Sequence, residues 1–465
     1  MSTGIAPSVP RQDAMHGHGP MNPLQYVEAP SNIPPMHAET TPTTSVMQKI
    51  FGCSPARPCE VAFHGLRMDV TLPGRGWYRA EGKKTVLHEL NGIFEAGKLT
   101  AIMGSSGAGK TSLLNAVGGE AAGGSLSGRI TINGQGISTE VMRRLRGFVF
   151  QDDVMMGTMT VREAITMSAR LRLPEDVPLA QKLERVEQVM QILHLEQCGD
   201  TVMGDSEASN ISGGERKRVG IAMELVTNPS ILFLDEPTSG LDTFTAYTVC
   251  RTLKDLALAG RTVVATIHQP SSDVFHMFDN LLLLAKGRIM YQGPAPAAVD
   301  YFGQRGFPCP HHTNPADHIF MRILNDQDAT SAASREESQA LVMNMLRPFL
   351  RVNICDACVS MYACRDEREV PQALVMKMLD EYAASEHALS IDAQCRTPGP
   401  GVDVASVHTV AGLQTQIRVL FARSKNNVLR NRMILRAKIG QCIFFGLLVG
   451  LIWRSLTKTQ RGIYM

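Results

Sequence analysis

The sequence has no marked excess of charge of either sign and no segment typical of a secretory leader. Lysine and arginine number 46 against 44 aspartates and glutamates, for a formal net charge of +2. This balance excludes a chain-wide attraction to nucleic acid, so any basic patch must be local. Residues 1–10 contain no basic start followed by an apolar run, and we therefore expect no secretory signal.

The ten cysteines lack a repeated spacing that would indicate a disulfide framework. Reduced thiols in a cytosolic compartment are therefore the expected state. Cys355, Cys358 and Cys364 have a metal-like spacing, but without a second clear pair we do not expect a zinc site there. The segment 309–312, with one cysteine and two histidines, is a weaker candidate still.

Composition changes along the chain define four segments. The 465 residues suffice for two or three domains, and an apolar content of 44% allows a large core. Residues 1–58 are rich in proline and lack apolar periodicity, so we expect a disordered tail, whose three histidines are solvated rather than metal-bound. Residues 59–325 predict an α/β domain, residues 326–410 a partly helical linker, and residues 411–465 membrane-associated helices.

Apolar runs and capping signals place several elements of the α/β domain. The expected strands are 99–103, 231–234 and 262–267, with a hairpin of 281–285 and 288–292 around a Lys-Gly turn. Thr160 and Glu163 fit a capping box for a helix that ends before Pro174. Leu183, Val186, Met190 and Leu193 then recur at helical spacing.

A glycine-rich loop follows the first of these strands. Gly104-Ser105-Ser106-Gly107-Ala108-Gly109-Lys110-Thr111 fits the pattern of glycine, four residues and Gly-Lys-Thr, and Ser112 opens the next helix-like stretch. Such a loop turns its N–H groups toward a triphosphate, and the helix adds its positive end. Lys110 is expected to reach the β- and γ-phosphates, and Thr111 to ligate Mg²⁺. The alternative is a glycine-rich turn that binds nothing.

Two carboxylates end the predicted strand 231–234. A buried strand that delivers Asp235 to its carboxyl end suits Mg²⁺ coordination. Glu236, one residue on, can orient the attacking water as a general base. The alternative is an ordinary strand that runs into an acidic turn, and the phosphate loop disfavours it.

A second candidate for an anion cradle is Ser212-Gly213-Gly214-Glu215, which opens a predicted helix over residues 216–226. Ser212 caps the helix, and the glycines leave N–H groups open to a phosphate. The alternative is a capped helix after a turn.

Two further polar residues stand at predicted strand ends. His268 follows the strand 262–267 and can donate to a γ-phosphate, although a satisfied core histidine is the alternative. Gln151 ends the apolar run 148–150, and its amide can contact Mg²⁺ or the attacking water, with a polar strand end as the alternative.

Together these motifs resemble the ATP-binding cassette (ABC) family. The phosphate loop, Gln151, Ser-Gly-Gly-Glu, Asp235-Glu236, Ser239-Gly240-Leu241-Asp242 and His268 occur in that family's order. The resemblance implies a P-loop NTPase with a RecA-like core, an antiparallel β-subdomain and a helical subdomain, followed by a helical membrane segment. It also implies ATP and Mg²⁺ as ligands, held between two cassettes that pack head to tail.

By the same resemblance, the residues take distinct roles in a hydrolysis-competent site. Ser212 and Gly214 would contact the ATP held by Lys110 of the partner subunit, and Asp242 would act across the dimer. Glu236 would be the catalytic base, with His268 as the γ-phosphate sensor.

Longer motifs indicate the subfamily. Gln151-Asp152-Asp153, ISGGERKR at 211–218, Ile267-His268-Gln269-Pro270 and Asn314-Pro315-Ala316-Asp317 are similar to the G-subfamily half-transporters, the pigment, sterol and drug exporters. That group also places its ATPase before its membrane domain. Two departures stand out. His318 occupies a position where an aromatic is usual, and no clear adenine-stacking aromatic precedes the phosphate loop, with Phe63 as no more than a candidate.

The C-terminal residues predict attachment to a membrane. Residues 413–429 fit an amphipathic interfacial helix, with Leu413, Ile417, Leu420, Phe421 and Val428 near one face. Residues 439–453 are mostly apolar, and 433–456 reach the roughly 20 residues that a span requires. More basic residues precede than follow this run, which predicts a cytoplasmic N-terminal side. A buried soluble helix is the alternative.

The resemblance therefore predicts a membrane-bound half-transporter subunit that exports lipids, sterols or other hydrophobic compounds. Its expected partners are a second half-transporter and membrane lipid, without nucleic acid. Further spans are expected by resemblance, so the chain would be a fragment or a short form cut after its first span. The alternatives are a soluble cassette ATPase that acts on nucleic acid or ribosomes, and a non-transporting partner that dampens a complete half-transporter.

Overall fold

The computed structural model describes residues 58–72, 82–121, 124–151, 155–204, 209–310, 313–321, 372–397, 411–430 and 432–463. The expected tail up to residue 57, the pair Asp152-Asp153, the two histidines at 311–312 and the three cysteines at 355, 358 and 364 lie outside these residues.

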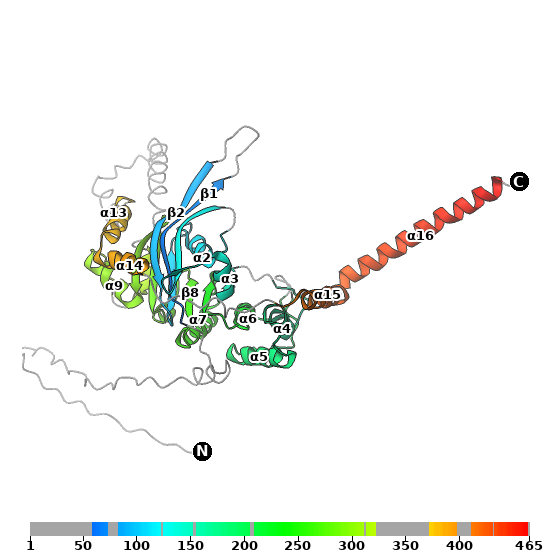
Figure 1. Cartoon of the computed structure of the whole chain (residues 1–465), viewed down its shortest axis with the longest axis horizontal. Coiled ribbons are helices and arrows are strands. Elements are labelled where there is room, and N and C mark those ends of the chain that lie inside the picture. Colours follow the sequence, from blue (N-terminus) through cyan, green and yellow to red (C-terminus); the bar gives the residue numbers. More distant parts are fainter. Residues whose placement is uncertain are drawn as a thin grey trace, which may run out of the picture. The chain divides into compact units, whose positions relative to one another are not determined.

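A six-stranded sheet in the order β10-β9-β3-β8-β7-β6 forms the centre of the α/β domain (Figure 1). Its strands are β3 (Leu99–Gly104), β6 (Arg146–Val149), β7 (Ile231–Leu234), β8 (Thr262–Thr266), β9 (Asn280–Ala285) and β10 (Arg288–Pro294). All are parallel except β10, which pairs with β9 as an antiparallel hairpin. The strands and the hairpin expected from the sequence are confirmed.

Alternate residues of these strands enter two different cores. In β7, Leu232 and Leu234 pack on one face of the sheet, whereas Ile231 and Phe233 pack on the other. A strand that is buried on both faces has no polar side to show, so its sequence is a continuous apolar run. This explains why the sequence marked β7 so clearly.

One face of the sheet is covered by a second, antiparallel sheet in the order β2-β1-β4-β5 and by the helix after the phosphate loop. These elements are β1 (Val61–Leu72), β2 (Gly82–Phe94), β4 (Gly124–Ile132), β5 (Gln135–Gly136), α2 (Lys110–Gly118) and α3 (Thr139–Leu145). They correspond to the predicted antiparallel β-subdomain and part of the core.

The other face is covered by helices that contribute to the larger core. They are α4 (Val161–Arg172), α5 (Leu179–Ile192), α6 (Gly213–Leu225), α7 (Thr243–Leu258), α8 (Ser272–Phe275), α9 (Ala295–Gln304) and α10 (Pro315–Ile319). The capping box of Thr160 and Glu163 begins α4 as expected. Helices α4 to α6 form the helical subdomain, so the predicted P-loop NTPase fold is confirmed.

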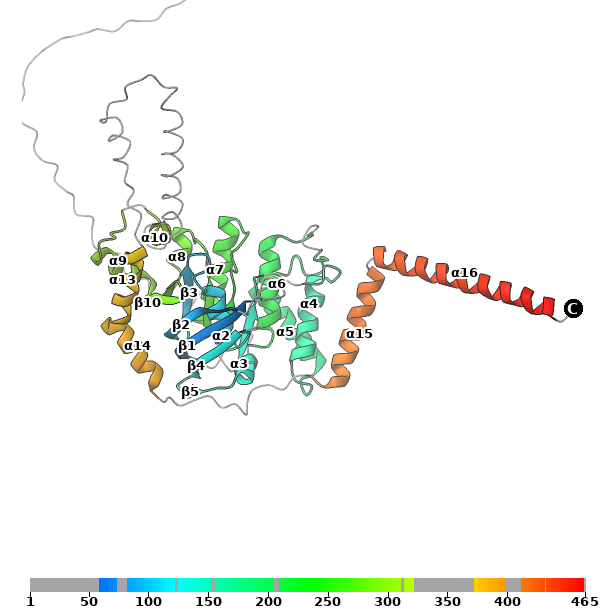
Figure 2. The ribbon, with the colours of Figure 1, turned by 90° about the horizontal axis from the view of Figure 1, so that it is seen from above.

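Part of the segment assigned to a linker packs on the α/β domain. Helix α13 (Gln372–Ala383) lies against β10, and α14 (Glu386–Arg396) lies against β1 and β2 (Figure 2). Leu379 and Tyr382 of α13 are buried, and the Cys395 thiol of α14 donates to the Gly92 carbonyl oxygen at 3.4 Å. These helices extend the hydrophobic core beyond the last helix of the cassette.

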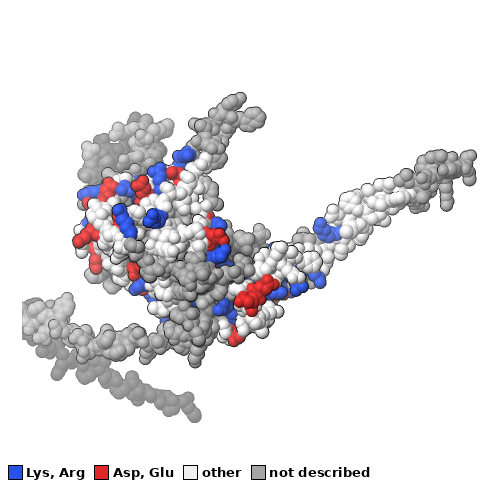
Figure 3. Space-filling view, viewed as in Figure 1, with Lys and Arg blue, Asp and Glu red and all other residues white. Residues whose placement is uncertain are grey.

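The last two helices are α15 (Leu413–Arg430) and α16 (Arg432–Ile463). Helix α15 lies along α4 through Val419, which is buried, while the apolar face expected from the sequence is exposed. In α16, the stretch Leu435–Trp453 is long and apolar enough to cross a membrane, with a mean hydropathy of 1.6. Beyond basic atoms near its start, the described part of α16 presents an uncharged surface (Figure 3).

Candidate nucleotide-binding site

Four neighbouring parallel strands deliver the candidate residues to one edge of the sheet. β3 runs into the phosphate loop, β6 into Gln151, β7 into Asp235 and Glu236, and β8 into His268. Parallel strands end at a common edge, where open α/β sheets bind their ligands. Residues up to 164 positions apart in the sequence therefore meet (Gly104 and His268).

The phosphate loop is shaped by glycines in the left-handed region. Gly107 has φ +77° and Gly109 has φ +100°, and a Cβ added to Gly107 would meet no atom within 4 Å, so the loop has an open side. Lys110 Nζ donates to the carbonyl oxygens of Gly104 at 2.9 Å and of Ser105 at 3.1 Å. Burial lowers the pKa of Lys110, while Glu236 and Asp235 oppose this shift. A buried ammonium at the N-terminus of α2 favours an anion, because the end of the helix adds its own positive potential.

A buried carboxylate lies beside the start of α2. Asp235 Oδ1 accepts hydrogen bonds from Thr111 Oγ1 at 3.1 Å and from Thr266 Oγ1 at 2.6 Å. Thr266 Oγ1 also accepts from the Glu236 backbone N–H at 2.7 Å. The Thr266 hydroxyl thus fixes both acidic residues, a role that the sequence analysis missed. Its signal was a polar residue at the last position of a buried strand.

Glu236 occupies an uncommon backbone conformation, with φ +46°. Left-handed residues other than glycine store strain and cluster at functional sites. Its Oε2 accepts a hydrogen bond from Gln151 Nε2 at 3.0 Å, and the Gln151 carbonyl oxygen accepts from Lys217 Nζ of α6 at 2.6 Å. The structure therefore brings Gln151 and Glu236 together, and it ties them to the helix of the Ser-Gly-Gly-Glu motif.

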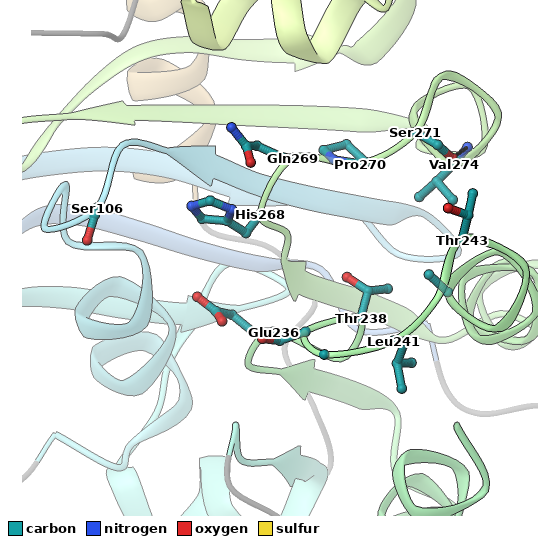
Figure 4. A pocket seen from close by; sticks show the side chains of 13 residues that line it. Ser106, Glu236, Thr238, Leu241, Thr243, His268, Gln269, Pro270, Ser271 and Val274 are labelled. Carbon is teal, nitrogen blue, oxygen red and sulfur yellow. Dashed lines mark hydrogen bonds between the residues drawn. The ribbon is translucent and has the colours of Figure 1, made fainter. Parts of the chain in front are cut away.

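His268 is exposed and lines a cleft of about 530 Å³ together with Glu236 and Ser106 of the phosphate loop. The Glu236 carboxylate and the His268 ring point into the same space, toward Ser106 (Figure 4). The alternative of a satisfied core histidine is therefore wrong.

Residues beyond β8 support the His268 turn. Asn314 Nδ2 donates to the Pro270 carbonyl oxygen at 2.9 Å, and the Phe320 ring lies 5.5 Å from the His268 ring. His318, the departure from the family pattern, has its Nε2 3.1 Å from the Phe307 carbonyl oxygen. Phe320 is an aromatic contact of His268 that the sequence analysis did not identify.

The Ser-Gly-Gly-Glu motif and Asp242 begin two exposed helix N-termini. Ser212 Oγ accepts from the Glu215 N–H, and Glu215 Oε2 accepts from the Ser212 N–H, which completes a capping box on α6. Asp242 caps α7, and hydrogen bonds from Thr245 and the Phe244 N–H lower the pKa of its carboxyl. Among the described residues, the phosphate loop forms no hydrogen bond with either turn.

The structure does not support Phe63 as the candidate for adenine stacking. Its side chain is fully buried against Phe94, 5.4 Å between ring centroids, and beneath Gly92. A ring enclosed in this core has no face open to an adenine base.

The residues present fit Mg²⁺. Mg²⁺ prefers oxygen ligands and is usually held by one or two carboxylates together with substrate phosphates. Asp235 and Thr111 supply a carboxylate and a hydroxyl beside the phosphate loop. Among the described residues, no group of three or more His, Cys, Asp or Glu could hold a metal alone. The set therefore suits a metal that arrives with a phosphate ligand.

Fold and site together define an ABC-type nucleotide-binding domain. Residues 87–239 match the family model described as ABC transporter, and residues 268–381 match one described as ABC-2 type transporter.

Curated relatives carry the same assignment. ABC transporter G family member 13 of Arabidopsis thaliana is 44% identical over 272 residues, 57% of this chain and 39% of the relative. The broad substrate specificity ATP-binding cassette transporter ABCG2 of Bos taurus is 38% identical over 393 residues, which cover 82% of this chain and 56% of the relative. Protein white of Drosophila melanogaster is 34% identical over 413 residues, which cover 85% of this chain and 55% of the relative.

The chain belongs to the ABC transporter family and is of the G type. It spans about 40 to 60% of the length of these relatives. The family assignment and the match to an ABC-2 type model indicate a membrane protein, and they favour the transporter interpretation over a soluble cassette ATPase.

Proposed function

We propose that this chain binds and hydrolyses ATP as the cassette subunit of a half-transporter. The observation that carries the proposal is the convergence of Lys110, Asp235, Glu236, Gln151 and His268 at one edge of the sheet. A phosphate-binding lysine, a metal-binding carboxylate and a positioned general base are the parts that phosphoryl transfer to water requires.

Each group has a task that follows from its surroundings. The loop from Gly104 to Thr111, with Ser112, holds the phosphates, and Lys110 exchanges its carbonyl partners for phosphate oxygens. Thr111, Asp235 and Gln151 hold Mg²⁺, which neutralises phosphate charge when bound. Glu236, oriented by the Gln151 amide, accepts a proton from water. His268 faces the same cleft and donates to the terminal phosphate.

Two cassettes are required for a complete site. The Ser212 turn and the Asp242 turn are exposed helix N-termini, which leaves both open to a second chain. A second half-transporter, identical or different, places its phosphate loop against Ser212, Gly213, Gly214 and Glu215. Closure around ATP and reopening after hydrolysis then move the helices attached to the cassette.

The membrane side supports export. Helix α15 packs on α4, α4 packs on α6, and Lys217 of α6 bonds the Gln151 carbonyl oxygen, while the exposed apolar face of α15 suits the lipid interface. Helix α16 supplies one span, with the cassette on the cytoplasmic side. The similarity to G-type half-transporters extends to the cargo, which we propose to be a lipid, a sterol or another hydrophobic compound.

The decisive test is Lys110→Ala in the full chain, purified from membranes. We expect a loss of ATP affinity of at least about tenfold and loss of turnover, because the lysine is a principal phosphate contact. Lys98→Ala, an exposed lysine before β3, is the matched control. Unchanged affinity and turnover in Lys110→Ala would refute the function, and release of the chain by carbonate extraction would refute membrane attachment.

A further inference from the structure

The turn of the Ser-Gly-Gly-Glu motif, here called the signature turn, meets the Asp242 turn of the same chain through one side chain. Gly214 is the second residue of α6, and a Cβ added to it would lie 2.0 Å from Cγ2 of Thr245 in α7. Carbon atoms do not approach so closely, so a larger residue at 214 must displace Thr245. The backbone of Gly214 lies outside the left-handed region, and its conformation does not demand glycine.

The other branch of the same threonine holds Asp242. Thr245 Oγ1 donates to Asp242 Oδ2 at 2.6 Å, while Asp242 Oδ1 accepts from the N–H groups of Phe244 at 3.1 Å and Thr245 at 3.0 Å. The hydroxyl and the methyl of threonine share one carbon and rotate together. The rotamer that satisfies Asp242 is therefore also the one that presses the methyl against Gly214.

The remaining glycine of the signature turn packs on the same turn. A Cβ on Gly213 would lie 3.2 Å from Cδ2 of Leu241, the residue before Asp242. Leu241 and Thr243 line the cleft that holds Glu236 and His268. The Asp242 turn thus contacts the signature turn on one side and the cleft on the other.

We propose that Thr245 is a positioning residue that couples the signature turn to the Asp242 turn, and that residue 214 is glycine because of the Thr245 methyl. The inference rests on the proposed function. In that function the signature turn contacts the ATP held by the partner subunit, whereas the cleft with Glu236 and His268 receives the ATP held by this chain. Displacing the methyl withdraws the hydroxyl from Asp242, so a change in the signature turn reaches the cleft.

A double-mutant cycle tests the coupling in the full chain, purified from membranes. The variants are Gly214→Ala, Thr245→Ser, their combination, and Thr245→Val. Serine keeps the hydroxyl and removes the methyl, whereas valine keeps the methyl and removes the hydroxyl. Thr248→Val is the matched control, because the Thr248 hydroxyl donates to the Phe244 carbonyl oxygen of its own helix and forms no other hydrogen bond in the described part of the chain. The readouts are ATP turnover with Mg²⁺ and the midpoint of thermal unfolding.

We expect Gly214→Ala to lower turnover about tenfold and to lower the unfolding midpoint, as contacting residues couple on this scale. Adding Thr245→Ser should recover most of both losses, because the space for the new methyl returns while Asp242 keeps its partner. Thr245→Val should lower turnover severalfold, and Thr248→Val should leave it unchanged.

Two results would overturn the inference: equal loss in Gly214→Ala and in the double variant, or wild-type turnover in Thr245→Val. Failure of the proposed function would give a different result, because the Lys110→Ala variant would then retain the nucleotide affinity of the wild type. In that case the unfolding midpoints decide, and a double variant no more stable than Gly214→Ala would refute the coupling.

Discussion

Gln151 Nε2 donates a hydrogen bond to Glu236 Oε2 at 3.0 Å, which joins the carboxyl ends of β6 and β7. The two residues are 85 positions apart in the sequence. The bond orients the Glu236 carboxylate, whose backbone is already held in a left-handed conformation, toward the cleft that His268 shares. A base that is fixed in this way loses little entropy when it engages a water molecule.

Replacement of Glu236 by glutamine should separate binding from hydrolysis. The amide keeps the size of the carboxylate but cannot accept a proton, so we expect ATP affinity within about threefold of the wild type and turnover lowered at least about 100-fold. Nucleotide binding and phosphate release by the purified chain measure the two effects. Turnover like that of the wild type would exclude Glu236 as the base.

Replacement of Thr266 by valine should destabilise the site from within the sheet. The change leaves the Asp235 carboxylate and the Glu236 N–H without their shared hydroxyl, at a cost of about 1–3 kcal/mol in the free energy of unfolding.

Thr100→Val is the matched control for this measurement. Thr100 is buried in the neighbouring strand β3, and its Oγ1 has no hydrogen-bond partner among the described residues. We expect that variant to be neutral or slightly stabilised in denaturant unfolding. Equal destabilisation of both variants would contradict the role assigned to Thr266.

Replacement of Phe320 by leucine should affect turnover more than nucleotide affinity. The ring packs against His268, which is otherwise exposed, and a smaller side chain lets the imidazole leave the cleft. We expect kcat to fall by about two- to tenfold, a modest loss in line with a misplaced catalytic group, with KM for ATP little changed. Phe307→Leu, in the same C-terminal stretch, is the control and should retain kcat.

The attachment of α15 to α4 should weaken in acid. Glu163 Oε1 accepts a hydrogen bond from Arg430 Nη2 at 2.8 Å, and this pairing lowers the pKa of Glu163 below its ordinary 4.5. A lowered folded pKa means that the stabilisation is present above pH 4.5 and is lost as the pH falls through the folded value. Both side chains are more than a third exposed, so the effect is at most about 1 kcal/mol.

Spin labels on α4 and α15 can measure this weakening as a broader distance distribution below pH 4.5. The Glu163→Gln variant should show the broad distribution already at neutral pH, because it lacks the charge at every pH. A distribution in the wild type that does not change with pH would contradict the prediction.

Short stretches of sequence were enough to predict several elements of the α/β domain and the order of the candidate site residues along the chain. Strand β7 was predictable because both of its faces are buried. The phosphate loop was predictable because its glycines and Lys110 follow a strand and begin a helix. The capping box at Thr160 was legible because its bonds join residues only three positions apart. Local geometry and burial on both faces leave their mark in a short window of sequence.

Contacts between side chains of different elements emerged only when the chain was seen folded. The folded chain buries Phe63 under Gly92, sets Phe320 against His268, and turns the Thr245 methyl toward Gly214. It also buries Val419 on the face of α15 that packs on α4. Such pairings depend on how helices and strands pack in space. The pattern of apolar and polar residues along the sequence does not specify which residue of another element each side chain contacts.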